Sequence, residues 1–283
     1  MNLGRVGVWW SGSWRAAGGG SADVRAELEA LGYGALWSSG GFEPGLSPRF
    51  AEELAATHHM AVASGIVSIW ATTPAELAPA VAELEERFPG RFVLGLGASH
   101  APLVADYHRP YSKMVEFLDQ LDAVEPPVPA PRRVLAALGP RMLTLAAERA
   151  AGAHPYFVPV EHTAAARGIL GPGPLLAPEV TVLLESDADR ARAAARTFTT
   201  GYLAMPNYAN NLRSLGYGDE DLTGGGSDRL VDAVVAWGDA GRVAARVREH
   251  LEAGADHVCV QVVGGGDGFP LEGYRSLAGL LMD

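Results

Sequence analysis

Eight short apolar segments, separated by helical patterns, constrain the fold of this 283-residue chain more than any other feature. The segments are mostly continuous runs of apolar residues, which is typical of parallel strands that are buried on both faces. Strand and helix alternate along the whole chain, so the pattern predicts an α/β fold with a parallel sheet. Eight repeats favour a (β/α)₈ TIM barrel over a doubly wound sheet. We expect strands at 4–10, 34–39, 61–69, 91–97, 132–138, 153–159, 179–185 and 257–263.

The helical patterns between these strands also give one expected departure from a simple barrel. Ser21 is a plausible N-cap and Gly32 a plausible C-cap of the first helix. The stretch 187–254 is predicted to be a long helical region, and an Asn/Gly-rich interruption at 206–228 indicates an insertion before strand eight. No linker divides residues 1–283, so we expect a single domain. The other expected helices are 21–32, 47–59, 73–88, 110–124, 139–152 and 271–282.

Composition and charge narrow the classes of function. The net charge of −11 and the pI of about 5.2 argue against unaided binding to nucleic acid. No run reaches 18 uninterrupted apolar residues, so no membrane span is expected, and the first residues lack the pattern of a signal peptide. The single cysteine, Cys259, excludes an internal disulfide and fits a reduced, cytoplasmic setting. We expect a cytoplasmic protein whose partner is a small molecule.

The fourth predicted strand ends in the sequence RFVLGLGASH, which contains Gly95-x-Gly97. A dinucleotide-binding fingerprint would place a third glycine at the position of His100, so that interpretation is weak. Barrel enzymes keep their chemistry at the carboxyl ends of the strands. Gly97 and His100 are therefore candidate site residues at the end of strand four.

Two further segments at strand ends are open to two interpretations each. Gly139 and Pro140 open a helix directly after strand five, where free backbone N–H groups and Arg141 could bind an anion. The same residues also fit an ordinary helix start with a solvated arginine. Gly65, between Ser64 and Ile66 in strand three, indicates a bulge or the close approach of a ligand, or else close packing in the barrel.

The strand ends are rich in aromatic residues and poor in ionisable ones. A flat apolar cofactor fits such a lining, although ordinary packing under loops also explains part of it. The eight histidines show no metal-binding spacing, and no carboxylate cluster or G-x-S-x-G elbow is present, so no metal site is expected. This favours hydride chemistry, in which a cofactor performs the difficult step. The aromatic residues are Trp9, Trp10, Trp37, Phe42 and Trp70, and the main ionisable ones are His100, Asp106, His154 and Glu185.

The chain also resembles the bacterial-luciferase-like flavin and deazaflavin oxidoreductases, and most of all their short actinobacterial branch, often labelled coenzyme F-420-dependent. The match extends over nearly the whole chain and is specific as a set. It is carried by the stretches SGIVSIWATTPAELA, GRFVLGLGASHAPLV, YHRPYSKMVEFLDQLDA, ALGPRMLTLAAERAAGAHPYFVPVEHT, NYANNLRSLGY, GGSDRLVDAVVAWGD and HLEAGADHVCVQVV.

The resemblance implies a luciferase-like (β/α)₈ barrel, a homo-oligomer, and a cofactor across the carboxyl ends of the strands. It implies a non-prolyl cis peptide against the cofactor ring within 64–66, and a strand-five loop at 138–142 that holds the ribityl and phosphate end. The cofactor-binding residues expected in this way are Ser64, Gly65, Ile66, Gly97, Leu138, Gly139, Arg141, Met142 and His154.

This sequence departs from the sugar-oxidising relatives at two places. They carry an Asp-His pair after strand two, where this chain has Gly40 and Gly41, and a Glu after the strand-four glycine, where it has Ala98. Sugar-phosphate oxidation is therefore not expected. We expect an oxidoreductase that transfers a hydride between coenzyme F-420, an 8-hydroxy-5-deazaflavin, and a small apolar organic substrate, with His100 as proton relay. The alternatives are an FMN-dependent monooxygenase and a non-catalytic ligand-binding barrel.

Overall fold

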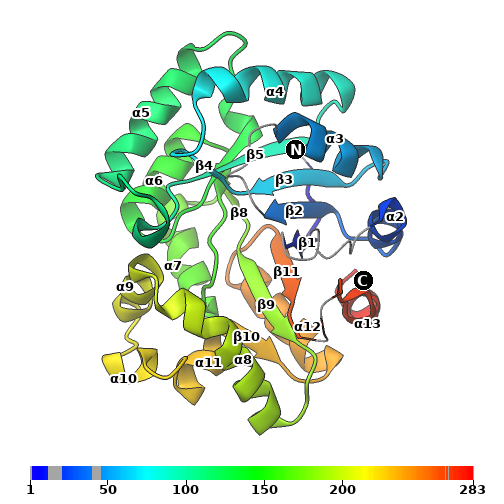
Figure 1. Ribbon diagram of the computed structural model, residues 1–283. Helices are drawn as coiled ribbons and strands as arrows, with labels where there is room; N and C mark the ends of the chain where they lie inside the picture. Colours follow the sequence, from blue (N-terminus) through cyan, green and yellow to red (C-terminus); the bar gives the residue numbers. More distant parts are fainter. Residues whose placement is uncertain (1, 12–20, 40–45, 265, 267, 283) are drawn as a thin grey trace.

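The computed structural model describes residues 2–11, 21–39, 46–264, 266 and 268–282. Its strands run parallel in one sheet that curls around an interior, with helices outside it (Figure 1). The strands are β1 (Val6–Trp10), β2 (Ala35–Ser39), β3 (Ala61–Gly65), β4 (Val67–Ser68), β5 (Phe92–Gly97), β6 (Arg133–Leu135), β7 (Gly152–Ala153), β8 (Leu175–Leu176), β9 (Glu179–Leu183), β10 (Val235–Trp237) and β11 (Val258–Val262).

The sheet closes on itself because β8 continues directly into β9. The first part of this segment pairs with β7, and Glu179 N–H extends the pairing by donating to Pro155 O at 2.8 Å. On its other side the segment pairs with β11, where Cys259 N–H donates to Pro178 O at 2.9 Å. Because β11 pairs in turn with β1, the predicted (β/α)₈ barrel is confirmed.

The helices cover the outside of the barrel, and apolar side chains fill both the interior and the layer between sheet and helices. Trp9, Trp37, Ala63, Val93 and Cys259 belong to the inner cluster. The larger cluster joins the outer faces of the strands to the helices. The helices that follow the strands are α2 (Ala22–Ala30), α3 (Leu46–Ala55), α4 (Pro74–Arg87), α5 (Pro110–Ala123), α6 (Pro140–Arg149), α7 (Val160–Leu170), α12 (Ala240–Glu252) and α13 (Leu271–Leu281), with 3₁₀ turns at η1 (Ala101–Leu103) and η2 (Ala130–Arg132).

The insertion before the last strand forms a separate group of helices beside the carboxyl ends of the strands (Figure 1). Its own apolar cluster includes Tyr208, Leu212 and Leu230. The predicted helical region 187–254, with its interruption at 206–228, is wrong at Val235–Trp237, where β10 pairs with β9. Three apolar residues after a helix gave too short a pattern to separate a strand from a buried helical turn. The inserted helices are α8 (Ala188–Leu203), α9 (Pro206–Ser214), α10 (Asp219–Leu222) and α11 (Asp228–Val234).

The predicted strands are all shorter in the structure, and the fifth, expected over 132–138, is reduced to β6. The sixth was expected over 153–159 but β7 has two residues, because Pro155 and Pro159 carry no N–H and Phe157 has a φ of 57°. The third is interrupted after Gly65 and resumes as β4. Cys259 is free and buried. None of the described helices has both the length and the apolar character that a membrane crossing requires.

Candidate functional site

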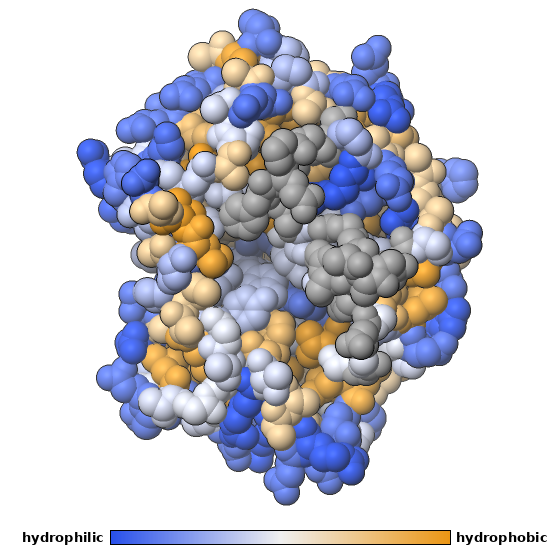
Figure 2. Space-filling view, in the orientation of Figure 1, coloured by the Kyte–Doolittle hydropathy of each residue, from blue (hydrophilic) through white to orange (hydrophobic). Residues whose placement is uncertain are grey.

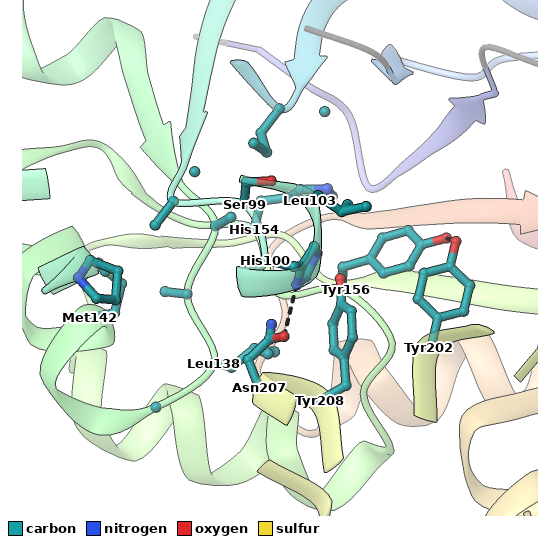
Figure 3. A pocket seen from close by; sticks show the side chains of 18 of the residues that line it. Ser99, His100, Leu103, Leu138, Met142, His154, Tyr156, Tyr202, Asn207 and Tyr208 are labelled. Carbon is teal, nitrogen blue, oxygen red and sulfur yellow. Dashed lines mark hydrogen bonds between the residues drawn. The ribbon is translucent and has the colours of Figure 1, made fainter. Parts of the chain in front are cut away.

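A cavity of about 390 Å³ opens at the carboxyl ends of the strands, where the sequence placed the candidate residues. Figure 2 shows this face hollowed near its centre, and Figure 3 shows side chains from the barrel and from the insertion around the cavity. No Lys, Arg, Asp or Glu side chain is among the described residues that line it. The lining residues are Trp9, Gly65, Ile66, Gly97, Ala98, Ser99, His100, Leu103, Tyr107, Pro110, Ala136, Ala137, Leu138, Gly139, Met142, His154, Tyr156, Tyr202, Asn207 and Tyr208.

Glycines let the strands and Trp9 approach closely on the barrel side of this cavity. A Cβ on Gly65 would lie 2.6 Å from the Trp9 ring, and one on Gly97 would lie 2.5 Å from Ile66. A Cβ on Gly95 would lie 1.9 Å from the Ser64 carbonyl oxygen. The Gly95-x-Gly97 pattern therefore serves close packing between strands, which explains why it lacks the rest of a nucleotide fingerprint.

The peptide between Gly65 and Ile66 is cis, so the distortion expected within 64–66 is confirmed. Gly65 and Ile66 line the cavity, whereas Ser64 does not. The Ser64 hydroxyl is buried, donates to Gly95 O at 2.9 Å and accepts from Gly95 N–H at 2.8 Å. Ser64 thus joins β3 to β5 behind the cavity, and its expected contact with a cofactor would need a change in this pairing.

The loop between β6 and α6, which follows the fifth predicted strand, lines the cavity through Leu138, Gly139 and Met142. A Cβ on Gly139 would meet no atom within 4 Å, so this residue faces open space. The Leu138 carbonyl oxygen lies 2.9 Å from His162 Nε2, which fixes the loop to α7. Arg141 is exposed, does not line the cavity and places its guanidinium 4.0 Å from the Tyr111 ring centroid. The loop therefore offers backbone to a ligand, while its arginine stacks on a neighbouring helix.

The insertion supplies a wall of the cavity that the sequence analysis missed. Tyr202 from α8 and Asn207 and Tyr208 from α9 line it together with Tyr156 from the barrel (Figure 3). Tyr156 donates to Gln261 Oε1 at 2.7 Å, so the Tyr202 hydroxyl, also 2.7 Å from the Tyr156 hydroxyl, is the donor in their pair. The stretch NYANN within the Asn/Gly-rich interruption was the available signal, but nothing in its spacing connects it to a barrel strand.

His100 lies on this wall, just beyond the end of β5. Its Nδ1 is 2.7 Å from Asn207 Oδ1, and its ring centroid is 5.0 Å from that of Tyr208. Ser99, directly before it, has a φ of 58°, which turns the chain away from the strand direction. The candidate proton relay is thus held by residues of the insertion.

His154 lies at the base of the cavity and is almost completely buried. Its ring stacks on Trp37 with centroids 4.0 Å apart and planes 12° apart, and its Nδ1 is 2.6 Å from Ala177 O. Burial lowers the pKa of His154 to about 4. The ring is therefore neutral near pH 7, with Nδ1–H donating to the Ala177 carbonyl.

A buried acid lies in the barrel interior near the tyrosines. Glu179 accepts from the Thr181 hydroxyl at 2.6 Å and from Phe157 N–H at 3.3 Å. Burial raises the pKa of Glu179 to about 8. Glu179 is not among the residues that line the cavity, so we assign it no contact with a ligand.

Several residues singled out in the sequence lie away from the cavity. Trp70 donates to Ala98 O at 2.7 Å and packs on Tyr107, so it supports the wall without lining it. Asp106 is exposed, and Glu185 pairs with Arg190. Phe42, Gly40 and Gly41 lie outside the described residues. Trp10 and Trp37 are buried and do not line the cavity.

The described residues that line the cavity do not form a metal-binding arrangement. In the part of the chain that the structure describes, no three His, Cys, Asp or Glu side chains lie together as metal ligands would. The titratable side chains that line it are His100, His154 and tyrosines. These described side chains can form neutral hydrogen bonds, exchange protons and contact flat apolar groups.

A family model for luciferase-like monooxygenases matches residues 21–257. The chain belongs to this family. No curated protein matches its sequence. The luciferase-like family model spans the barrel from α2 to the start of the last strand, including the inserted helices that complete the cavity.

Solved structures share the fold of this luciferase-like chain at low sequence identity. An F-420-dependent secondary alcohol dehydrogenase in complex with an F-420–acetone adduct superimposes with a TM-score of 0.74, at 15% identity over 100% of both chains. The coenzyme F-420-dependent tetrahydromethanopterin reductase from Methanopyrus kandleri gives a TM-score of 0.66, at 15% identity over 97% of this chain and 98% of that one.

A third similar structure is a monooxygenase. The oxygenating constituent of 3,6-diketocamphane monooxygenase from Pseudomonas putida, in complex with FMN, gives a TM-score of 0.65 at 15% identity, over 100% of this chain and 97% of that one. The structures that resemble this luciferase-like chain thus include both deazaflavin and flavin enzymes, and the likeness at this identity establishes the fold.

Proposed function

We propose that this luciferase-like protein is an oxidoreductase that transfers a hydride between coenzyme F-420 and a small, uncharged, mostly apolar organic substrate. The observation that carries the proposal is the cavity itself, which is lined mostly by apolar and aromatic side chains. Apart from the tyrosines and the buried His154, the titratable side chain among its described lining residues is the half-exposed His100. Such a site has little chemistry of its own, which is typical of enzymes that leave the difficult step to a cofactor.

The residues present fit a deazaflavin or flavin. The cavity volume of about 390 Å³ is within the range of ligand sites, roughly 300–1,000 Å³. Gly139 leaves open space beside the start of α6, where backbone can approach a ligand closely. We assign the ring to the wall formed by Gly65, Ile66 and Gly97, and the phosphate-bearing chain to the loop at 138–142. His154 would support the ring from the base of the cavity.

When bound, coenzyme F-420 supplies a carrier for two electrons and a proton as hydride. In the protein, Trp9 and the tyrosines would exclude water from the cavity, and one side chain would exchange a proton with the substrate. His100 is that group, because it lines the cavity and is the histidine there that is not enclosed by the barrel.

FMN-dependent monooxygenation of a similar substrate is the second candidate function. The FMN complex among the similar structures favours it, and so does the absence of any cationic side chain among the described lining residues. The deazaflavin coenzyme has an anionic tail, whereas FMN carries one phosphate and needs fewer donors.

Titration of the purified protein with each cofactor separates these functions. We expect coenzyme F-420 to bind at micromolar concentration and to change its absorbance on binding, and FMN to bind more weakly. Tighter binding of FMN would favour the monooxygenase. If neither cofactor binds, the protein is a ligand-binding barrel of another kind, and the proposal is wrong.

Replacing Gly139 by tryptophan is expected to weaken cofactor binding at least tenfold, a loss of about 1.4 kcal/mol. Gly139 has a φ of −83°, which any residue adopts, so the change fills the cavity without straining the backbone. Gly279→Trp is the matched control, because Gly279 is exposed on α13 and a Cβ there also meets no atom within 4 Å. Calorimetric titration measures both variants. Equal affinities for the two would place the cofactor elsewhere.

A further inference from the structure

We infer that Asn207, at the start of inserted helix α9, is a positioning residue that fixes the tautomer of His100 and leaves its Nε2 free for the ligand. The inference rests on the proposed function only in giving His100 a proton to exchange. It assigns to the insertion a direct part in the chemistry of the barrel site.

The hydrogen bond between the two side chains determines the tautomer. Asn207 Oδ1 lies 2.7 Å from His100 Nδ1, and an amide oxygen can only accept. Nδ1 therefore carries the hydrogen. In the neutral ring Nε2 is then an acceptor, and no partner for it is found among the described residues. Both side chains line the cavity, and Figure 3 shows the ring above the amide.

The fold holds this pair in place from both sides. Pro206 begins α9, so Asn207 belongs to the rigid first turn of that helix. The next residue, Tyr208, is buried and packs its ring 5.0 Å from that of His100. Ala209 and Leu212 anchor the buried face of the helix. The amide is thus presented to His100 by a packed helix whose contacts do not depend on a ligand.

The tautomer decides which ligand group His100 can meet. While the ring is neutral, Nε2 accepts a hydrogen bond, so the ligand group beside it is an O–H or N–H donor. If that proton is transferred, it moves to Nε2, the ligand atom keeps the bonding electron pair, and the imidazolium still donates from Nδ1 to Asn207. A neutral amide orients the ring without the charge that a carboxylate would add.

Nitrogen-15 NMR of the imidazole ring reads the tautomer directly and needs no substrate. The signals of His100 are assigned by their loss in His100→Gln. We expect the Nδ1–H form in the wild-type protein. In Asn207→Ala the ring loses its acceptor partner, and we expect a shift toward the Nε2–H form, which free histidine side chains favour. Asn210→Ala is the control, because Asn210 is exposed on the same helix and does not line the cavity.

Asn207→Asp is the rescuing variant, because its carboxylate also accepts from Nδ1 and should preserve the Nδ1–H form. An Nε2–H tautomer in the wild-type protein, or no change in Asn207→Ala, would overturn the inference. The cofactor titrations give a separate result. If no cofactor binds but the tautomer responds as expected, the proposed function fails and the positioning role stands.

Discussion

Lowering the pH from about 6.5 to 4 is expected to remove several kcal/mol from the free energy of unfolding. Burial lowers the pKa of both His154 and His257 to about 4. His257 is fixed as a neutral ring, since its Nδ1 faces Gly4 O at 2.9 Å and its Nε2 accepts from Trp37 Nε1 at 3.0 Å. Protonation of His257 at Nε2 would break its hydrogen bond with Trp37. A proton on the buried Nε2 of His154 would find no hydrogen-bond acceptor among the described residues.

The direction of the effect follows from proton binding. Between pH 6.5 and 4 the unfolded chain binds a proton at each histidine that the folded protein excludes, so stability falls as the pH falls. At about 1.4 kcal/mol for each pH unit, each ring contributes about 3 kcal/mol over this range. The two together are comparable with the whole stability of many proteins, about 5–15 kcal/mol.

Glu179 acts in the opposite direction. Its pKa of about 8 in the folded protein exceeds the ordinary value of 4.5, so the unfolded chain loses this proton first as the pH rises. Its contribution to stability is complete below about pH 4.5 and is lost as the pH rises to 8. Between pH 4.5 and 6.5 the two histidines outweigh it. We therefore expect greatest stability near pH 6.5.

Urea unfolding at a series of pH values measures this profile. Glu179→Gln should remove the decline between pH 6.5 and 8. The substitution His58→Gln is the control for the acid side, because His58 is exposed and should leave the decline below pH 6.5 unchanged. A flat profile from pH 4 to 6.5 would contradict the assignment of neutral, buried rings.

Replacing His100 by glutamine is expected to lower turnover about 10²- to 10⁴-fold, the usual contribution of a general acid or base. Glutamine keeps a similar length and polarity but cannot exchange a proton near neutral pH. Cofactor affinity should change little, because the proposed contacts to the ring and the phosphate lie at the ends of β3 and β5 and on the loop after β6. The measurement is steady-state turnover with any substrate found for the cofactor-bound protein.

His108→Gln is the matched control for that experiment. His108 lies in the same segment after β5, is exposed and does not line the cavity. It should retain wild-type turnover. Equal activity of the two variants would remove His100 from the proton transfer and leave Tyr208 or Tyr202 as the group to test next.

The sequence alone determined the barrel and the end of it that holds the site. Strand and helix patterns depend on local periodicity, which is written in neighbouring residues. The same local information placed Gly65, Gly97, Gly139 and His100 at strand ends, and all four line the cavity. The mid-strand Gly65 by itself left a bulge, the approach of a ligand and close packing open, and the expectation of a distorted peptide there came from the family resemblance.

Only the tertiary structure decided which side chains meet. His100 and Asn207 are far apart in the chain, and their contact depends on how the insertion packs over the barrel. Tyr202 and Tyr208 face the cavity for the same reason. Arg141 shows the converse, since a charge at the right helix start turned to Tyr111 instead of the cavity. Side-chain contacts across a fold arise from packing between elements, and periodicity within an element carries no record of them.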